Sequence, residues 1–183
     1  MKYLLSLILT LNLYAVKLDH SYINLNYNSL STYQKGVIIE AYNIGERLII
    51  DGESYGATLA TFTLTESSAG RLLTGDNYQS FGLCHLQLAR VREILPRSTY
   101  LEGYNSLSDV QLSSSLTTDS TLNLILCGLN FKLNLQRWKY YSKAVRAHNG
   151  YNPYGNFHNE SYYSRFINNM QIVKLVLAEQ QEF

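Results

Sequence analysis

The residues from Thr65 to Leu88 read T-E-S-S-A-G-R-L-L-T-G-D-N-Y-Q-S-F-G-L-C-H-L-Q-L and place a carboxylate, that of Glu66, at the end of an apolar segment. This segment ends at Leu64, and a polar loop leads to a second one, for which the pattern predicts a helix that begins at Gly82. A carboxylic acid at the rim of apolar packing has its charged form disfavoured, so its pKa rises and it can act as a general acid near neutral pH. Alternatively, Glu66 is a solvated residue in the last turn of a helix, as most glutamates are.

The length and composition predict one globular domain without a strongly charged face. A chain of 183 residues suits one domain with a sizeable core, and 46% apolar with 16% charged residues exclude disorder. The formal net charge of +1 gives no long-range field that would select nucleic acid or anionic lipid, so we expect no nucleic-acid partner. The aromatic residues are mostly tyrosine, 16 against one Trp, which suits a wet groove because each tyrosine ring has an apolar face and a polar tip.

The first residues have the pattern of a secretory signal peptide. A positively charged start precedes a short apolar run, Tyr3–Leu13, and Ala15 offers a small residue for cleavage. The run is too short to span a membrane, so we expect residues 1–15 to be removed and residues 16–183 to form the domain, with no stable membrane span. The alternatives are an uncleaved anchor and an ordinary buried first helix.

The two cysteines, Cys84 and Cys127, leave two alternatives open. In an exported protein they can form a disulfide, which would close a long loop and stabilise the fold. Both also lie in apolar patterns typical of helices, where a free cysteine behaves as a small hydrophobic residue. Two cysteines and four scattered histidines give no spacing typical of metal ligands, so we expect neither a metal nor a cofactor.

The hydrophobic periodicity predicts one all-helical domain without strands, repeats or a linker. Ser31 and Asp119 are the expected N-caps of two helices, and Gly70 is expected to close the helix that carries Glu66. Residues 16–30 are expected to be irregular. The expected helices are 31–51, 55–67, 82–95, a short helix or turn within 105–116, one from 119 through 133, 137–147, and, after a loop at 151–159, a last one through 163–177.

Three motifs follow one another on this helical framework: E-S at 66–67, S-F-G-L-C-H-L at 80–86, and A-H-N-G at 147–150, with a tyrosine pair at 162–163 beyond them. In this order they resemble the soluble lytic transglycosylases of glycoside hydrolase family 23 and the related goose-type lysozymes. That family shows E-S, then G-L-M-Q-I, then A-Y-N-A-G, then a tyrosine in a Y-V-x-x-V-like helix. The resemblance covers residues 33–176. Further matches are Asp119, Asn123 and Gly128.

The resemblance implies a mainly α, single-domain, lysozyme-like fold with a groove for the β-1,4 glycan strands of peptidoglycan. It implies that Glu66 is the single general acid and base. The acid would protonate the oxygen between N-acetylmuramic acid and N-acetylglucosamine. The carboxylate would then take a proton from the muramyl 6-hydroxyl, which closes a 1,6-anhydro ring. The substrate's own acetamido group replaces the second carboxylate of most glycosidases. An exported enzyme of this kind acts in the periplasm.

The same resemblance implies contacts to the substrate around Glu66. Ser67 would orient the carboxylate or a bound sugar, Gly82 would let the backbone approach the sugar, and backbone groups of Leu83 would meet its acetamido arm. For Ser67 the alternative is a hydroxyl bonded to its own helix, and for Gly82 a glycine that merely starts a helix.

The resemblance assigns further contacts near the end of the chain. Asn149 would contact the sugar next to the scissile bond; alternatively, it is a helix-end asparagine in a left-handed turn. Tyr162 matches the motif tyrosine best, and Tyr163 would replace it if the register is off by one. Either tyrosine is otherwise a core aromatic residue.

Three positions depart from the family pattern. Cys84 replaces Met, His85 replaces Gln, and His148 replaces the tyrosine of A-Y-N-A-G. These changes leave the general acid in place and affect the contacts to the sugar, for which His85 and His148 remain candidates. They motivate an alternative function, a weakly catalytic wall-binding component of a secretion, conjugation or phage apparatus with a partner in the cell envelope.

Asp76 is the only acid in the loop after Glu66. Goose-type lysozymes use an aspartate in a comparable loop to position water, so the resemblance also allows a lysozyme-like hydrolase. Alternatively, Asp76 only forms the turn, as its neighbours Gly75 and Asn77 suggest.

Overall fold

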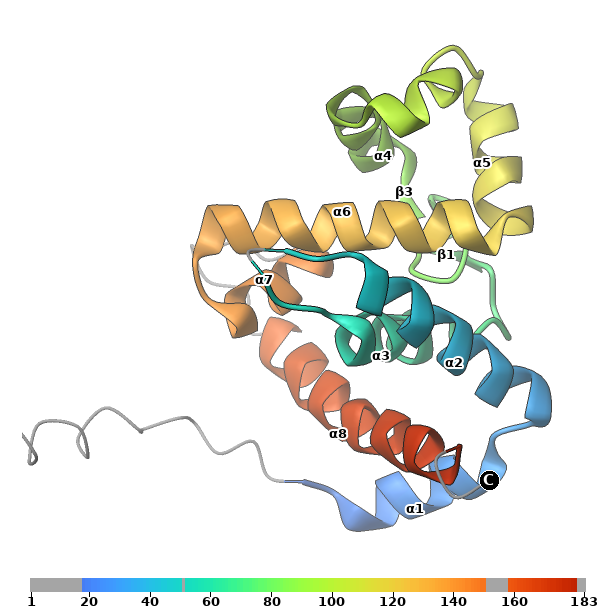
Figure 1. The fold of residues 1–183 in the computed structure, drawn as a ribbon. Helices are drawn as coiled ribbons and strands as arrows, with labels where there is room; N and C mark the ends of the chain where they lie inside the picture. The colour runs from blue at the N-terminus through green and yellow to red at the C-terminus, as the bar shows by residue number, and fades with distance from the viewer. Residues whose placement is uncertain (1–17, 51, 151–157, 181–183) are drawn as a thin grey trace, which may run out of the picture.

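The computed structural model describes residues 18–50, 52–150 and 158–180, and it is mainly helical, as the sequence predicts (Figure 1). The predicted signal peptide, residues 1–15, and most of the predicted loop 151–159 lie outside the described residues. None of the helices in the described part of the chain is long and apolar enough to cross a membrane.

Helices α2 (Thr32–Arg47) and α3 (Gly56–Ser67) pack against each other. Ser31 caps α2, as predicted, through a capping box. The two helices approach closely because glycines face each other: a Cβ atom on Gly45 would lie 2.7 Å from the Cα atom of Gly56. This close packing buries α3 along nearly its whole length, up to the turn that carries Glu66.

The polar segment after α3 forms a small antiparallel sheet, which the sequence pattern does not predict. Its strands are β1 (Thr74–Gly75), β2 (Ser80–Phe81) and β3 (Leu86–Gln87), paired in that order. The prediction of a helix that begins at Gly82 is therefore wrong: the chain turns there from β2 into β3, and α4 spans Leu88–Ile94. Strands of two residues are too short to show a period of two, so periodicity could not reveal them.

Helix α6 (Ser120–Trp138) crosses the middle of the molecule (Figure 1). Asp119 caps it as predicted, and its side chain accepts a hydrogen bond of 2.9 Å from the first turn. On one side lie α4 and α5 (Asp109–Thr118). On the other side lie α2, α3, α7 (Tyr141–His148) and α8 (His158–Glu179). Helix α6 contacts elements of both groups and so forms the wall that they share.

The segment predicted to be irregular contains a helix, α1 (His20–Ser29). The side chain of Asp19 caps it, and the hydroxyl of Tyr22 donates a hydrogen bond of 3.0 Å to Asn169 of α8. Asparagine and serine lower the intrinsic helix propensity of this segment, but packing on α8 outweighs that preference.

The other predicted helices are present, with ends that differ by a few residues. Two 3₁₀ helices, η1 (Leu95–Arg97) and η2 (Thr99–Tyr104), connect α4 to α5. Lys139 takes a left-handed conformation, with φ of +61°, and ends α6. For this reason α7 begins at Tyr141, four residues after the predicted start.

Candidate active site

Glu66 lies in the last turn of α3 with its side chain only 12% exposed. Burial raises the pKa of this carboxyl above its ordinary value, because the charged form loses its hydration. A hydrogen bond from Tyr162 and the charges of His85 and Arg165 lower the pKa of Glu66, but burial is the larger effect. Glu66 is therefore a shielded acid and not the solvated residue of the alternative interpretation.

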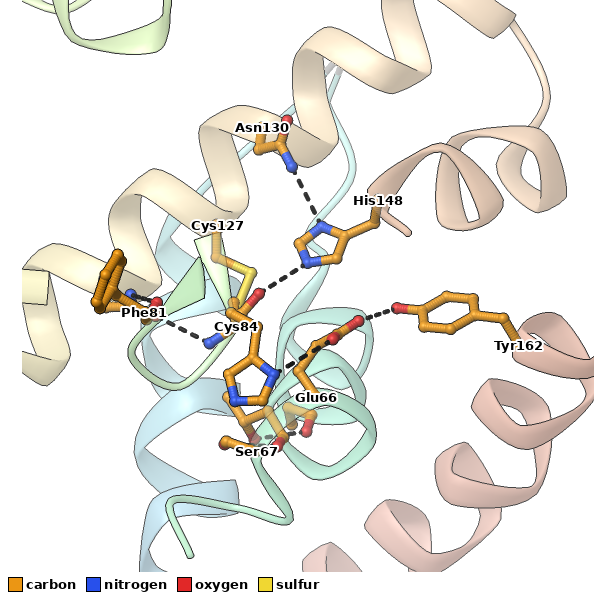
Figure 2. The surroundings of a disulfide bond; sticks show 12 residues. Glu66, Ser67, Phe81, Cys84, Cys127, Asn130, His148 and Tyr162 are labelled. Atoms are coloured by element: carbon orange, nitrogen blue, oxygen red, sulfur yellow. Dashed lines mark hydrogen bonds and ion pairs between the residues drawn. A yellow bond between two sulfur atoms is a disulfide. The ribbon is translucent and has the colours of Figure 1, made fainter. Parts of the chain in front are cut away.

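One oxygen of the carboxylate is bound by Tyr162 from α8 (Figure 2). The hydroxyl of Tyr162 donates a hydrogen bond of 2.5 Å to Oε1 of Glu66, and the tyrosine is 2% exposed. The ring of Tyr163 lies instead against Arg146, whose guanidinium carbon is 4.5 Å from the ring centre. Of the two tyrosines considered for the motif, Tyr162 is the one that contacts Glu66.

The other carboxylate oxygen faces His85. Nδ1 of His85 lies 3.8 Å from Oε2 of Glu66, and Nε2 lies 2.9 Å from the carbonyl oxygen of Leu72. Because a carbonyl oxygen only accepts, Nε2 carries a proton and donates it to this bond. The backbone of His85 has φ of +45°, a left-handed conformation that is uncommon outside glycine.

The turn that carries His85 is held against α6 by three contacts. Asn123 makes two of them: its Oδ1 accepts from the backbone N–H of Cys84, and its Nδ2 donates to the carbonyl of Phe81, both at 3.0 Å. The third is a disulfide between Cys84 and Cys127, whose Cα atoms are 6.1 Å apart (Figure 2). The structure thus shows the two cysteines bonded to each other, one of the two alternatives that the sequence left open.

His148, at the end of α7, contacts the same turn (Figure 2). Its Nε2 lies 3.1 Å from the carbonyl oxygen of Cys84, and its Nδ1 lies 3.2 Å from Nδ2 of Asn130. The ring stacks on Phe62, with ring centres 4.1 Å apart. Burial lowers the pKa of His148 to about 4, so the imidazole is uncharged at neutral pH.

Arg90 of α4 fixes the tautomer of His148 through Asn130. Its Nε donates a hydrogen bond of 2.7 Å to Oδ1 of Asn130, so the amide nitrogen of Asn130 faces His148. Nδ1 of His148 is therefore the acceptor, and Nε2 is the donor to Cys84. This chain of hydrogen bonds connects α4, α6 and α7 to the turn beside Glu66.

These elements enclose a cavity of about 580 Å³. Of the residues predicted for the site, the following line it: Glu66, Asp76, His85, His148 and Asn149. Asn149 is the C-cap of α7 and has φ of −92°, so it does not take the left-handed turn of the alternative interpretation. Tyr162 reaches the site only through its bond to Glu66.

Three residues predicted to contact the substrate take part in the packing of the structure. The hydroxyl of Ser67 donates to the carbonyl of Thr63 and accepts from the backbone N–H of Gly70, both at 3.0 Å, which matches the alternative of a hydroxyl bonded to its own helix. The side chain of Leu83 is buried in the core, and the predicted contact of its backbone groups with the acetamido arm stays a prediction.

Gly82 is needed for the packing of its turn on α6, and it is not among the residues that line the cavity. Its φ of +78° and the space around it both require glycine. A Cβ atom there would collide with the side chain of Asn123 and the carbonyl of Leu116.

The wall of the cavity that α6 provides was not predicted from the sequence. Asn130, Asn134 and Trp138 line the cavity and are four residues apart, so they share one face of the helix. Polar side chains at this spacing in an otherwise apolar helix were the available signal. Arg90 and Arg137 add positive charge to the same cavity.

The arrangement suits general acid–base chemistry, because a shielded acid faces a polar cavity between a hydroxyl donor and an imidazole. Within the described ranges, no group of three or more His, Cys, Asp or Glu side chains is placed to hold a metal ion. A scan against models of protein families and searches of the curated proteins and of the solved structures found no match for this chain.

Proposed function

We propose that this protein is a lytic transglycosylase that cleaves the glycan strands of peptidoglycan, with Glu66 as its single general acid and base. The observation that carries the proposal is the environment of Glu66, which is a buried acid with a raised pKa, bound by Tyr162 and open to a polar cavity. The ordered motifs that resemble family 23 supply the substrate class.

The proposal includes a lysozyme-like fold. Two groups of helices lie on either side of the long helix α6 (Figure 1). The cavity with Glu66 is lined by residues from α3, the small sheet, α4, α6 and α7. A glycan strand that entered this cavity would meet amide and guanidinium donors, which suit hydroxyl and acetamido groups.

In the proposed reaction, Glu66 begins as the neutral acid, which its raised pKa favours. It gives its proton to the glycosidic oxygen as the bond from that oxygen to the anomeric carbon breaks. The carboxylate then accepts the proton of the muramyl 6-hydroxyl while this oxygen bonds to the anomeric carbon. Tyr162 stabilises the intermediate carboxylate by donating to Oε1, and the acid is regenerated without a net change of protons.

We place the protein in the periplasm, where peptidoglycan is its partner. The signal-peptide pattern of residues 1–15 supports export, and the disulfide between Cys84 and Cys127 fits an oxidising compartment.

A hydrolase is the second candidate, and the position of Asp76 favours it. Asp76 lines the same cavity, and its charge raises the pKa of Glu66. A carboxylate there can bind a water molecule that replaces the 6-hydroxyl as the nucleophile. Asp76 also lies in a turn in which residues 76–78 all have positive φ, which fits its alternative role as a turn former.

The test is incubation of the purified protein with purified peptidoglycan, followed by mass determination of the products. The transglycosylase predicts 1,6-anhydromuramyl ends, and the hydrolase predicts reducing ends. Glu66→Gln should stop the loss of turbidity, whereas Glu102→Gln, an exposed residue of η2, should leave it unchanged. Unchanged clearing by Glu66→Gln would refute both catalytic proposals. Binding of the glycan without any product would favour the wall-binding component.

A further inference from the structure

His85 occupies a confined place beside Glu66. Its Nε2 is held by the carbonyl of Leu72 at 2.9 Å, and its ring packs on Gly75, where an added Cβ atom would lie 2.7 Å from Nδ1. The side chain of His85 is 14% exposed and that of Glu66 is 12% exposed. The left-handed backbone of His85 is maintained by the contacts that hold the turn to α6 through Asn123 and the disulfide.

The electrostatic effect of His85 on Glu66 depends on which ring nitrogens of His85 carry a proton. Because Nε2–H donates to Leu72, the neutral imidazole presents the unprotonated Nδ1 to Oε2 of Glu66. When Nδ1 takes a proton, a positive charge lies 3.8 Å from the carboxylate. This distance is too long for a direct hydrogen bond but short enough for strong electrostatic coupling in a shielded site.

The other groups that face this pair do not offer the same change of charge. From α8, Tyr162 is neutral because burial raises its pKa, and Arg165 is permanently charged. From the turn after β1, Asp76 adds negative charge. From α7, His148 is neutral because burial lowers its pKa to about 4. The imidazole of His85, by contrast, gains a positive charge when its second nitrogen takes a proton.

We propose that His85 is a positioning residue that controls the pH at which Glu66 exchanges its proton. The two groups form a coupled pair: a proton on Nδ1 of His85 favours the carboxylate of Glu66, and loss of that proton favours the acid. Glutamine, which occupies this position in the family that the sequence resembles, carries no charge and cannot have this effect. The kinetic consequence depends on the proposed function, whereas the coupling itself does not.

The coupling is tested by ¹³C NMR of the glutamate carboxyls between acid and alkaline pH, with the Glu66 signal assigned from its loss in Glu66→Gln. His85→Asn suits the site because asparagine tolerates a positive φ but cannot carry charge. In His85→Asn, the midpoint of the Glu66 titration should move upward by about one pH unit. Asp76→Asn should move it downward, since Asp76 acts in the opposite direction. His20→Asn, at an exposed residue of α1, should leave it unchanged.

The unmodified protein gives a second measurement if His85→Asn does not fold. The Glu66 carboxyl signal and the His85 ring signal should then show the same two inflections. The inference would be overturned if Glu66 had the same titration midpoint in His85→Asn and in the unmodified protein. It would also be overturned if the Glu66 signal of the unmodified protein showed a single inflection that the His85 signal does not share.

The kinetic measurement separates this inference from the proposed function. If the protein cleaves peptidoglycan, the alkaline limb of kcat/KM should move to higher pH in His85→Asn by the same amount as the NMR midpoint. Cleavage with an unchanged pH profile would overturn the inference and leave the function standing. Absence of cleavage with a shifted NMR midpoint would overturn the function and leave the coupling standing.

Discussion

Tyr162 and Glu66 are 96 positions apart in the chain, and the hydroxyl of the tyrosine donates a 2.5 Å hydrogen bond to the carboxylate. The contact joins α8 to the end of α3 in a buried place. It opposes the effect of burial on the carboxyl, because a donor stabilises the charged form. The proton affinity of Glu66 therefore depends on two elements far apart in the sequence.

Tyr162→Phe should raise the pKa of Glu66 further and reduce glycan cleavage at least about tenfold, since a hydrogen bond to a charged group contributes about 1.5–3 kcal/mol. The measurement is kcat/KM on purified peptidoglycan as a function of pH. Tyr163→Phe is the matched control, because Tyr163 packs on Arg146 and not on Glu66. Equal losses in the two variants would contradict a specific role for Tyr162.

Glu66→Gln should stabilise the protein at neutral pH. The folded-state pKa of Glu66 is raised, so its contribution to stability is present below the ordinary value of 4.5 and is lost as the pH rises through the folded-state value. Glutamine stays neutral throughout. Thermal unfolding should give a Tm a few degrees above that of the unmodified protein at neutral pH. This difference should shrink as the pH falls below 4.5, and a difference independent of pH would show that ionisation of Glu66 is not its cause.

His148 should have the opposite effect on the pH dependence of stability. Its folded-state pKa is lowered to about 4, so the unfolded chain binds a proton that the folded protein excludes, and stability is lost as the pH falls from 6.5 toward 4. His148→Gln should remove this part of the acid sensitivity while lowering stability at neutral pH. Urea unfolding at several pH values measures both effects, and His20→Gln on the exposed face of α1 should change neither.

Gly82→Ala should destabilise the protein much more than Gly52→Ala. Both glycines have similar positive φ, +78° and +84°, but a Cβ atom on Gly52 would meet nothing within 4 Å. The difference between the two variants therefore isolates the collision with Asn123 from the backbone strain. We expect a difference of about 2 kcal/mol or more in the free energy of unfolding, because the collision displaces a buried amide that makes two hydrogen bonds.

Replacing both Cys84 and Cys127 by alanine should lower stability by about 2–4 kcal/mol, the typical effect of losing a disulfide that closes a loop of this kind. Because the disulfide holds the turn that carries His85, the double variant should also cleave glycan more slowly than the unmodified protein. This loss should be present at temperatures at which the variant is still folded. Reduction of the unmodified protein should reproduce both effects and should leave the double variant unchanged. Full activity of the reduced, folded protein would show that Asn123 and His148 hold the turn without the disulfide.

The helices were predictable where local signals agree with packing. Ser31 and Asp119 cap helices as expected, because a capping side chain bonds to backbone within three residues of itself. The three short strands and the turn at Gly82 were not predictable, since their conformation depends on contacts with α6. Helix α1 was missed because its stabilising contacts come from α8.

The sequence by itself determined the helical class of the protein and singled out Glu66, because apolar periodicity and an acid at its edge are local features of the chain. Only the tertiary structure decided which groups surround that acid. Tyr162 rather than Tyr163 contacts it, Ser67 does not, and His85 faces its second oxygen. Which residues contact Glu66 depends on the direction of each side chain and on contacts between elements far apart in the chain. The proton affinity of Glu66 depends on all of these neighbours together.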